Sequence, residues 1–245
     1  MNFKDLNQFD KDVFNRLFDY YDSNINPNLI NVLENKEYNK ENRLSIYQTP
    51  FNSIIFASSS IYKIIKKKIK NNIEERKINL DDLKSLLDYN NYNDEDNTLC
   101  LFLNPENHIN INPSKYLKMR TLTKEDKIRF DKFRKETPSA DLQEGQLSIE
   151  DPVIVGCFDK DKLVSVASYW FWGDGLADIG VVTHPDYRQN GIGKVLISNL
   201  CNFGFELDRI NVYRHNQNNL ASRNLALSLN FKQKLIIETT KILKD

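Results

Sequence analysis

Cysteine, glycine, proline and net charge are all in short supply in this chain of 245 residues. It has three cysteines, eight glycines and seven prolines, and its 34 basic residues balance its 34 acidic ones. The cysteines, Cys100, Cys157 and Cys201, are widely spaced and odd in number, which excludes a disulfide framework and disfavours a metal site. We therefore interpret them as reduced thiols in a core, and we expect no bound metal.

The lack of net charge and of long apolar runs excludes further classes of protein. A chain without net charge carries no overall electrostatic footprint for nucleic acid. No apolar run approaches the length of a membrane span, and the first residues, Met1–Leu6, lack the apolar core of a signal peptide. We therefore expect a cytoplasmic protein with neither nucleic acid nor a membrane as its partner. The length fits one large or two small domains.

The most informative segment runs from Asp178 to Lys194. An extended apolar stretch ends at Pro185, two glycines follow, and a helix then begins. Its one-face apolar residues are Leu196, Ile197, Leu200 and Cys201. Gly191 and Gly193 remove two side chains where the first amides of the helix point outward without acceptors. Those amides and the positive end of the helix dipole suit a pyrophosphate.

Glycine spacing alone does not identify the segment. The run Gly173–Gly175 has the same G-x-G spacing but lies between two strand-like segments, which is typical of a hairpin turn. Leu196 stands where a dinucleotide-binding fingerprint needs a third glycine. Val195 stands where a Walker loop needs serine or threonine. Both of these nucleotide-binding motifs are therefore excluded.

The run Arg188–Gly193 resembles the R-x-x-G-x-G signature of the GNAT superfamily, the acyl-CoA-dependent N-acyltransferases. The resemblance extends from about Tyr116 to the C-terminus, with the pieces in the family's order. These are Met119–Asp126 with Thr123 as N-cap, the strands Val153–Phe158 and Leu163–Trp172, the strand Ile210–Tyr213, and the closing helix Asn219–Phe231. It implies an α/β fold of the α+β type, with a mixed, mostly antiparallel sheet flanked by helices.

Two positions depart from the family pattern. Asn230 replaces a glycine at the end of the closing helix, which is a mild change because asparagine also tolerates the left-handed conformation. Ala226 stands where many members carry a tyrosine that is proposed to protonate the departing thiolate. The resemblance therefore assigns a cofactor site but no general acid.

The resemblance implies transfer of an acetyl group from acetyl-CoA to a primary amine. The implied cofactor contacts are Val181, Val182 and Thr183 on the motif strand, Arg188, Gln189, Asn190, Gly191, Ile192, Gly193 and Lys194 in the pyrophosphate loop, and Asn219 and Ser222 on the last helix. A backbone N–H near Val182 is expected to meet the carbonyl charge, because a strand bulge and the splaying of the next strand leave donors unpaired. Asn219 and Ser222 are equally well explained as ordinary helix-cap residues.

Asp178 is the candidate catalytic base. An amine is mostly protonated at neutral pH, so a group has to accept its proton before nitrogen attacks the thioester. Asp178 lies one position from where related enzymes place a glutamate, and a strand bulge can absorb that offset. The alternative is an exposed aspartate at a strand end. Trp170 and Trp172 lie in the preceding strand, and one face of it is a candidate lining for the acceptor groove.

The acceptor amine is not specified by any motif. A small molecule is favoured over a protein terminus, because the chain has no obvious acidic tract that would dock a basic peptide. The competing hypothesis is a non-catalytic acyl-CoA-binding regulatory module, which the residue at Ala226 and the large unassigned first half both suggest.

Residues 1–113 form an N-terminal helix-rich region, and residues 114–245 form the GNAT-like domain. Spacing predicts helices over Phe3–Tyr21 and Ser60–Lys70, a loop over Asp88–Asn97 and a strand over Leu99–Leu103. Three interpretations of this region stay open: a degenerate second GNAT-like half, a helical cap over the acceptor site, and a dimerisation element that would make a homodimer.

Overall fold

The computed structural model describes residues 1–245 apart from 23, 70–75, 88, 114–115 and 244–245. Contacts divide the chain into two compact units. The N-terminal unit contains Met1–Cys100, Asn216–Asn219 and Gln233–Asp245, and the C-terminal unit contains Leu101–His215 and Leu220–Lys232. These bounds differ from 1–113 and 114–245, because the end of the chain returns to the N-terminal strands. The roles expected for those two ranges stay predictions.

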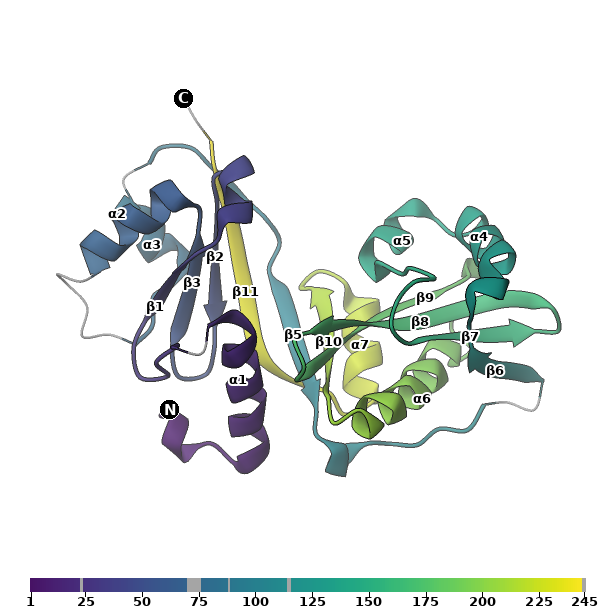
Figure 1. The fold of residues 1–245 in the computed structure, drawn as a ribbon. Helices are drawn as coiled ribbons and strands as arrows, with labels where there is room; N and C mark the ends of the chain where they lie inside the picture. The colour runs from purple at the N-terminus through teal and green to yellow at the C-terminus, as the bar shows by residue number, and fades with distance from the viewer. Residues whose placement is uncertain (23, 70–75, 88, 114–115, 244–245) are drawn as a thin grey trace. The chain divides into compact units, whose positions relative to one another are not determined.

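The N-terminal unit combines helices with a mixed sheet (Figure 1). Its elements are η1 (Phe3–Asp5), α1 (Gln8–Tyr21), β1 (Asn31–Glu34), η2 (Lys36–Lys40), β2 (Arg43–Gln48), β3 (Ser53–Ala57), α2 (Ser59–Ile69), α3 (Leu80–Leu87), β4 (Tyr92–Asp94) and most of β11 (Lys232–Ile242). Strand β3 pairs in parallel with β1 and antiparallel with β2. Strand β11 pairs antiparallel with both β2 and β4.

Apolar spacing explains the helices of this unit. The predicted first helix is divided in two, because the side chain of Asn7 accepts a hydrogen bond from the Asp10 amide and starts α1 there. Helix α2 confirms the second predicted helix, apart from Lys70, which lies outside the described residues. It packs with α3 on a core that includes Leu44, Ile55 and Ile61.

The predicted loop Asp88–Asn97 is wrong in part, because it contains strand β4. This strand has three residues, two of them exposed and polar, so it lacks the apolar alternation that marks a strand in a sequence. Its formation depends on pairing with β11, which lies some 150 residues further along the chain; Thr240 pairs with Asp94. Strands β1, β2 and β3 are also absent from the sequence-based expectation.

The C-terminal unit has a five-strand order of β10-β9-β8-β7-β6. Its elements are η3 (Pro105–Asn107), β6 (Leu117–Thr121), η4 (Lys124–Asp126), α4 (Lys127–Glu136), α5 (Ser139–Gly145), β7 (Ile154–Asp159), β8 (Lys162–Trp172), β9 (Leu176–Thr183), η5 (Pro185–Tyr187), α6 (Ile192–Glu206), most of β10 (Ile210–Asn216) and α7 (Leu220–Ser228). The boundary between the units falls inside β5 (Thr98–Leu103). Strands β9 and β10 are parallel, and the other pairs are antiparallel. The expected mixed, mostly antiparallel sheet flanked by helices is therefore confirmed.

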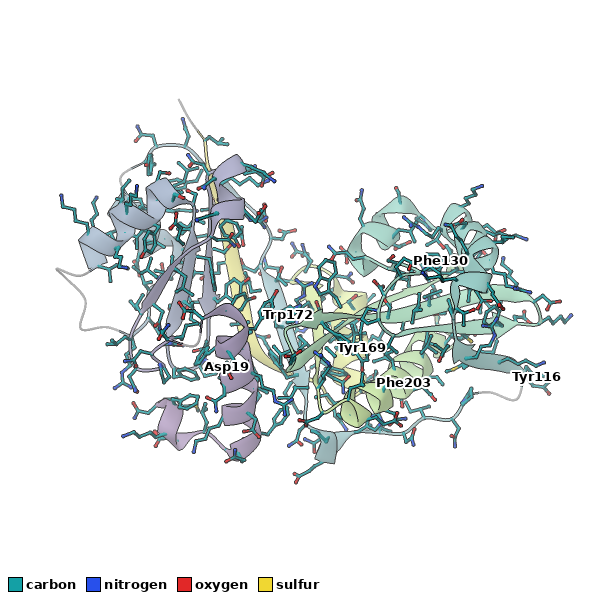
Figure 2. All side chains as sticks on the ribbon, viewed as in Figure 1. Asp19, Tyr116, Phe130, Tyr169, Trp172 and Phe203 are labelled. Carbon is teal, nitrogen blue, oxygen red and sulfur yellow. The ribbon has the colours of Figure 1, made fainter. Side chains whose placement is uncertain are left out.

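Helices cover both faces of this sheet. Helices α4 and α5 lie on one face, where Phe130 and Phe133 enter a core that also contains Val182 (Figure 2). Helix α6 covers the other face, where the Tyr169 hydroxyl donates a hydrogen bond to the Leu200 carbonyl at 2.8 Å. The apolar side predicted for α6 is buried there.

Candidate active site

Strand β9 separates from β10 halfway along its length. The two strands pair in parallel from Leu176 with Ile210 to Ile179 with Tyr213. On its other side β9 stays paired with β8 as far as Thr183. The second half of β9 therefore has a paired edge and an edge from which β10 has separated.

Backbone direction identifies the amides on the separated edge. The Gly175 carbonyl accepts from Ile210 of β10, whereas the His184 amide donates to the Val164 carbonyl of β8. Because successive residues of a strand point to opposite sides, the amides of Val181 and Thr183 face the separated edge. The register between β8 and β9 is unbroken, so the bulge expected in this strand is absent from the described pairs. The Val182 amide faces β8.

The loop after β9 is held by Arg188. Its Nε donates to the Thr183 carbonyl at 3.1 Å, and its guanidinium lies 2.6 Å from Asp141 of α5. Gln189 and Gly191 have φ values of 63° and 72°, so the backbone turns twice through the left-handed region. The Asn190 side chain donates to the carbonyl of Arg188. Arg188 therefore fixes the shape of the loop.

Helix α6 begins directly at this loop. The Val195 amide donates to the Gly191 carbonyl, so the amides of the three residues before Val195 have no intrahelical acceptor. A Cβ on Gly193 would lie 3.5 Å from Thr183 Oγ1 and 4.0 Å from Val181 Cγ2. The start of α6 and the end of β9 are therefore neighbours, with glycine backbone between them.

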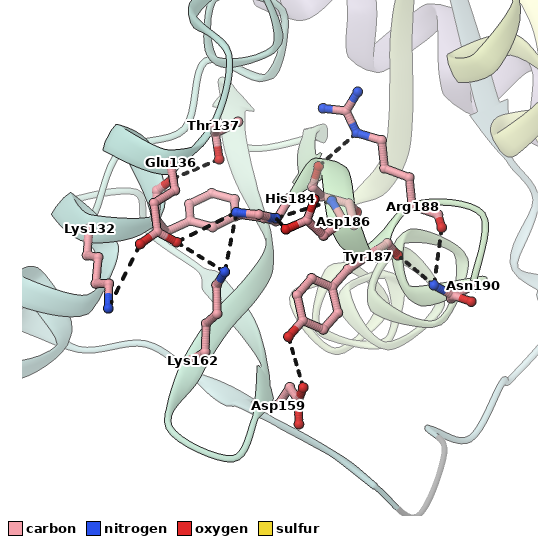
Figure 3. A network of polar contacts seen from close by, with 12 residues as sticks. Lys132, Glu136, Thr137, Asp159, Lys162, His184, Asp186, Tyr187, Arg188 and Asn190 are labelled. Atoms are coloured by element: carbon pink, nitrogen blue, oxygen red, sulfur yellow. Dashed lines mark hydrogen bonds and ion pairs between the residues drawn. The ribbon is translucent and has the colours of Figure 1, made fainter.

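A polar network fixes the end of β9 to α4 (Figure 3). Glu136 of α4 lies 3.2 Å from the Lys162 ammonium and 3.6 Å from His184 Nε2. The hydrogen bond from Lys162 lowers the pKa of Glu136. Tyr187 donates to Asp159 at 2.9 Å, and His184 Nδ1 accepts from the Asp186 amide. These contacts give His184 a structural role.

Asp178 is buried in an ion pair. Its carboxylate lies 2.6 Å from Arg214 Nε, and it also accepts from the Trp172 side chain and the Ile179 amide. Burial raises the pKa of Asp178 to about 6, although all three partners lower it. The alternative of an exposed strand-end aspartate is wrong, because only 5 % of the side chain is exposed.

The closing helix α7 brings Ser222 to Tyr213. The Ser222 hydroxyl hydrogen-bonds to the Tyr213 side chain, which is buried on β10 at its last pair with β9. Ala226 lies one turn further along the helix and is fully buried. Asn219 directly precedes α7 and groups by its contacts with the N-terminal unit.

Helix α5 is a part of the site that sequence reasoning missed. A Cβ on Gly180 would lie 2.2 Å from the Gly145 carbonyl oxygen, so the end of α5 and the middle of β9 meet backbone to backbone. Asp141 of the same helix holds Arg188. A glycine 35 residues before Gly180 carries no local signal of this contact.

The structure brings together part of the predicted cofactor set. Val181, Thr183, Arg188, Gly191 and Gly193 meet where β9 ends and α6 begins. Two further side chains of the set turn into apolar cores, because Val182 packs under α5 and Ile192 is only 4 % exposed. Ile192 can contact a ligand through its backbone alone, whereas the Val182 amide faces β8 and the Val182 carbonyl accepts from the Ser165 hydroxyl.

The described residues form neither a metal-binding cluster nor a membrane-spanning helix. Among the residues that the structure describes, no group of three or more His, Cys, Asp and Glu side chains is placed to hold a metal ion. In the same part of the chain, no helix combines the length and apolar character needed to cross a bilayer.

The fold and the site together define a class of α/β protein. In this class a strand runs through a loop into a helix, and the backbone amides at that turn are donors suited to an anionic ligand. The profile of the Acetyltransferase (GNAT) family matches residues 118–231. Residues 118–231 therefore form a domain of the GNAT superfamily of acetyltransferases.

Solved structures share the fold at low sequence identity. An acetyltransferase from the GNAT family of Colwellia psychrerythraea has a TM-score of 0.53 and 14 % identity, over 77 % of this chain and 76 % of that one. A GCN5-related N-acetyltransferase from Kribbella flavida has a TM-score of 0.52 and 14 % identity, over 70 % and 66 %. A functionally unknown conserved protein from Staphylococcus epidermidis has a TM-score of 0.50 and 9 % identity, over 70 % of both chains. No curated protein matches the sequence significantly.

Proposed function

We propose that the protein transfers an acetyl group from acetyl-CoA to a primary amine. The observation that supports this most is the position of Gly191 and Gly193, which start α6 beside the edge where β9 and β10 separate. An acyl-CoA needs donors for its pyrophosphate and an extended edge for its pantetheine arm. The loop and the start of α6 supply the donors, and the adjoining second half of β9 supplies the extended edge.

This geometry supports the proposed cofactor contacts. The outward amides of the loop and of the first turn of α6 suit the pyrophosphate, and the helix dipole adds to their attraction for anions. The amides of Val181 and Thr183 suit the pantetheine arm and the developing charge on the thioester oxygen. Arg188 shapes the loop, and Ser222 of α7 is the proposed contact near the thiol.

The reaction itself makes two demands on the protein. The amine has to lose a proton, and the sequence-based prediction gives this role to Asp178. The departing thiolate needs little assistance, because a thiol ionises at about pH 8.5 and its anion is a tolerable leaving group. Ala226 therefore does not argue against catalysis.

A small-molecule amine is the proposed acceptor, with the non-catalytic acyl-CoA-binding module as the second candidate function. Cytoplasmic location and a homodimer formed through residues 1–113 are further proposals that follow from the sequence alone.

Turnover and binding separate the two candidate functions. Acetyl-CoA consumption is measured with a panel of small primary amines and with a peptide that has a free N-terminus, and calorimetry measures acetyl-CoA affinity. We expect both binding and amine-dependent release of free thiol. Binding without turnover on any amine would favour the regulatory module, and an absence of binding would overturn both.

A further inference from the structure

The structure limits what Asp178 can do in the proposed reaction. A group that accepts the amine proton has to reach the amine directly or through one water. The Asp178 carboxylate is instead occupied by Arg214, Trp172 and the Ile179 amide, and it is almost fully buried. It is placed to hold Arg214 rather than to meet an incoming amine.

Glu144 lies beside the same strand and is exposed to solvent. It is the penultimate residue of α5, and the next residue, Gly145, is the one whose carbonyl oxygen meets Gly180. Gly180 directly precedes Val181, whose amide faces the separated edge of β9. The backbone contact therefore places Glu144 at the end of α5 that meets β9, one residue before Gly145.

A second observation relates Glu144 to β10. Burial raises the pKa of Tyr213, the hydrogen bond with Ser222 lowers it, and the negative charge of Glu144 raises it further. Tyr213 belongs to the last pair that joins β10 to β9. The Glu144 carboxylate is thus within electrostatic reach of the Tyr213 hydroxyl, which hydrogen-bonds with Ser222 of α7.

We propose that Glu144, and not Asp178, accepts the proton of the acceptor amine through a bound water molecule. The inference rests on the proposed acetyl transfer. The protonated amine first gives a proton through water to the Glu144 carboxylate, and the neutral nitrogen then forms a bond to the thioester carbon and releases its second proton to solvent. The carbon–sulfur bond then breaks, and the thiolate leaves with the electron pair and takes a proton from solvent. Asp178 is a positioning residue that holds Arg214 on the same sheet face.

The test compares Glu144→Gln with Asp178→Asn in the full-length protein. We expect Glu144→Gln to lower kcat with a small primary amine by about 10²- to 10⁴-fold at neutral pH, with unchanged acetyl-CoA affinity by calorimetry. Asp178→Asn should lower kcat by less than Glu144→Gln does. Glu150→Gln is the matched control, because it removes an exposed carboxylate from the same unit, and it should behave like the wild type.

The loss of kcat in Glu144→Gln is measured with nucleophiles of different pKa and at different pH values. A catalytic role of Glu144 predicts that the loss depends on both, and a structural role predicts that it does not. With hydroxylamine, which is already deprotonated at neutral pH, the loss in Glu144→Gln should shrink to within about tenfold. The loss should also shrink as the pH rises toward the pKa of an ordinary amine. The other charged groups of the site, Asp141 with Arg188 and Asp178 with Arg214, are unchanged in this variant, and so is Tyr213.

Three results would contradict the proposed role of Glu144. Near-normal kcat in Glu144→Gln with a large loss in Asp178→Asn would return the role to Asp178. An equal loss with hydroxylamine and with the ordinary amine would show that Glu144 is structural. A wild-type protein that binds acetyl-CoA but turns over no amine would overturn the proposed acetyl transfer, and this inference with it.

Discussion

At the scale of the residue, two glycines leave open the space proposed for the cofactor. Gly191 has a φ of 72°, and a Cβ built on it meets no protein atom within 4 Å. Its left-handed backbone conformation disfavours residues other than glycine. The space that a side chain would enter there is open to solvent or to a ligand. Gly193 adds a second position without a side chain beside the end of β9.

Gly191→Val should abolish acetyl-CoA binding. A β-branched residue at positive φ costs at least about 1–2 kcal/mol, and its side chain would occupy the space proposed for the pyrophosphate. Calorimetry measures the affinity, and circular dichroism reports the fold. Gly191→Asn is the matched control for backbone strain, because asparagine tolerates this conformation. Unchanged affinity in a folded Gly191→Val variant would remove the basis of the cofactor assignment.

Asp126 supports the start of α4 through charge. Its carboxylate accepts two hydrogen bonds at 2.6 Å from Arg120 and one from the Thr123 amide, and Thr123 is the N-cap residue of η4, the short helix that leads into α4. The hydrogen bonds with Arg120 lower the pKa of Asp126 to about 2. A carboxyl whose pKa is lower in the folded state stabilises the fold above its unfolded pKa, near 4, and loses that effect as the pH falls toward 2.

Asp126→Asn should therefore lower stability by about 1–2 kcal/mol at neutral pH, and the difference from the wild type should vanish near pH 2. Urea unfolding followed by tryptophan fluorescence measures this, because Trp170 and Trp172, the only tryptophans, lie in the same unit as Asp126. Asp131→Asn, on the exposed side of α4, is the control and should change stability little. A stability difference that stays constant between pH 7 and pH 2 would contradict the charge argument.

At the scale of the element, strands and helices with local patterns could be predicted, whereas those made by distant contacts could not. Helix α6 has a one-face apolar stripe, and β8 is a long apolar strand before a glycine turn. The polar β4 and the short α5 have neither signal. The loop from Arg188 to Gly193 is recognisable because its pattern lies within six residues. The pair Asp178–Arg214 spans 36 residues and depends on the register of β9 with β10.

Gly180→Ala should displace α5 from β9. The added methyl group would lie 2.2 Å from the Gly145 carbonyl oxygen, which is backbone and cannot rotate away. We expect a loss of about 1–3 kcal/mol in stability and a fall in kcat larger than that loss explains, because Glu144 moves with the helix. Thermal unfolding and amine-dependent turnover measure the two effects.

Gly156→Ala is the matched control for this prediction. Its methyl group would crowd the side chains of Leu122 and Leu163 in the same unit, and the nearest atoms that it would meet include none from α5. A comparable loss of stability with near-normal kcat is expected. If both variants lost the same share of activity, the contact between α5 and β9 would have no special role in catalysis.

At the scale of the whole molecule, the chain order and the compact units do not coincide. The N-terminal unit takes its last strand from the end of the chain, after the segment that matches the GNAT family. A sequence-based boundary at residue 113 misses this, because β11 carries no signal of which strand it will pair with. Contacts among residues far apart in sequence set the division.

Removal of residues 233–245 should therefore destabilise the N-terminal unit. Strand β11 pairs with β2 from Lys241 with Arg43 to Ile236 with Gln48, and Lys234 lies 3.0 Å from Asp10 of α1. Without β11, an edge of β2 is exposed, so its amides should exchange faster. Hydrogen exchange measured by mass spectrometry follows this in peptides that cover β2, while peptides from β8 in the same digest serve as the internal control.

Ile242→Ala gives the same test without truncation. Ile242 is buried in the core that also contains Leu44 and Ile65, and its loss should cost about 2–5 kcal/mol. The destabilisation should speed exchange in β2 more than in β8, because the lost contacts belong to the N-terminal unit. Unchanged protection of β2 in both variants would mean that this unit does not depend on the end of the chain, and the observed division into compact units would then have no counterpart in stability.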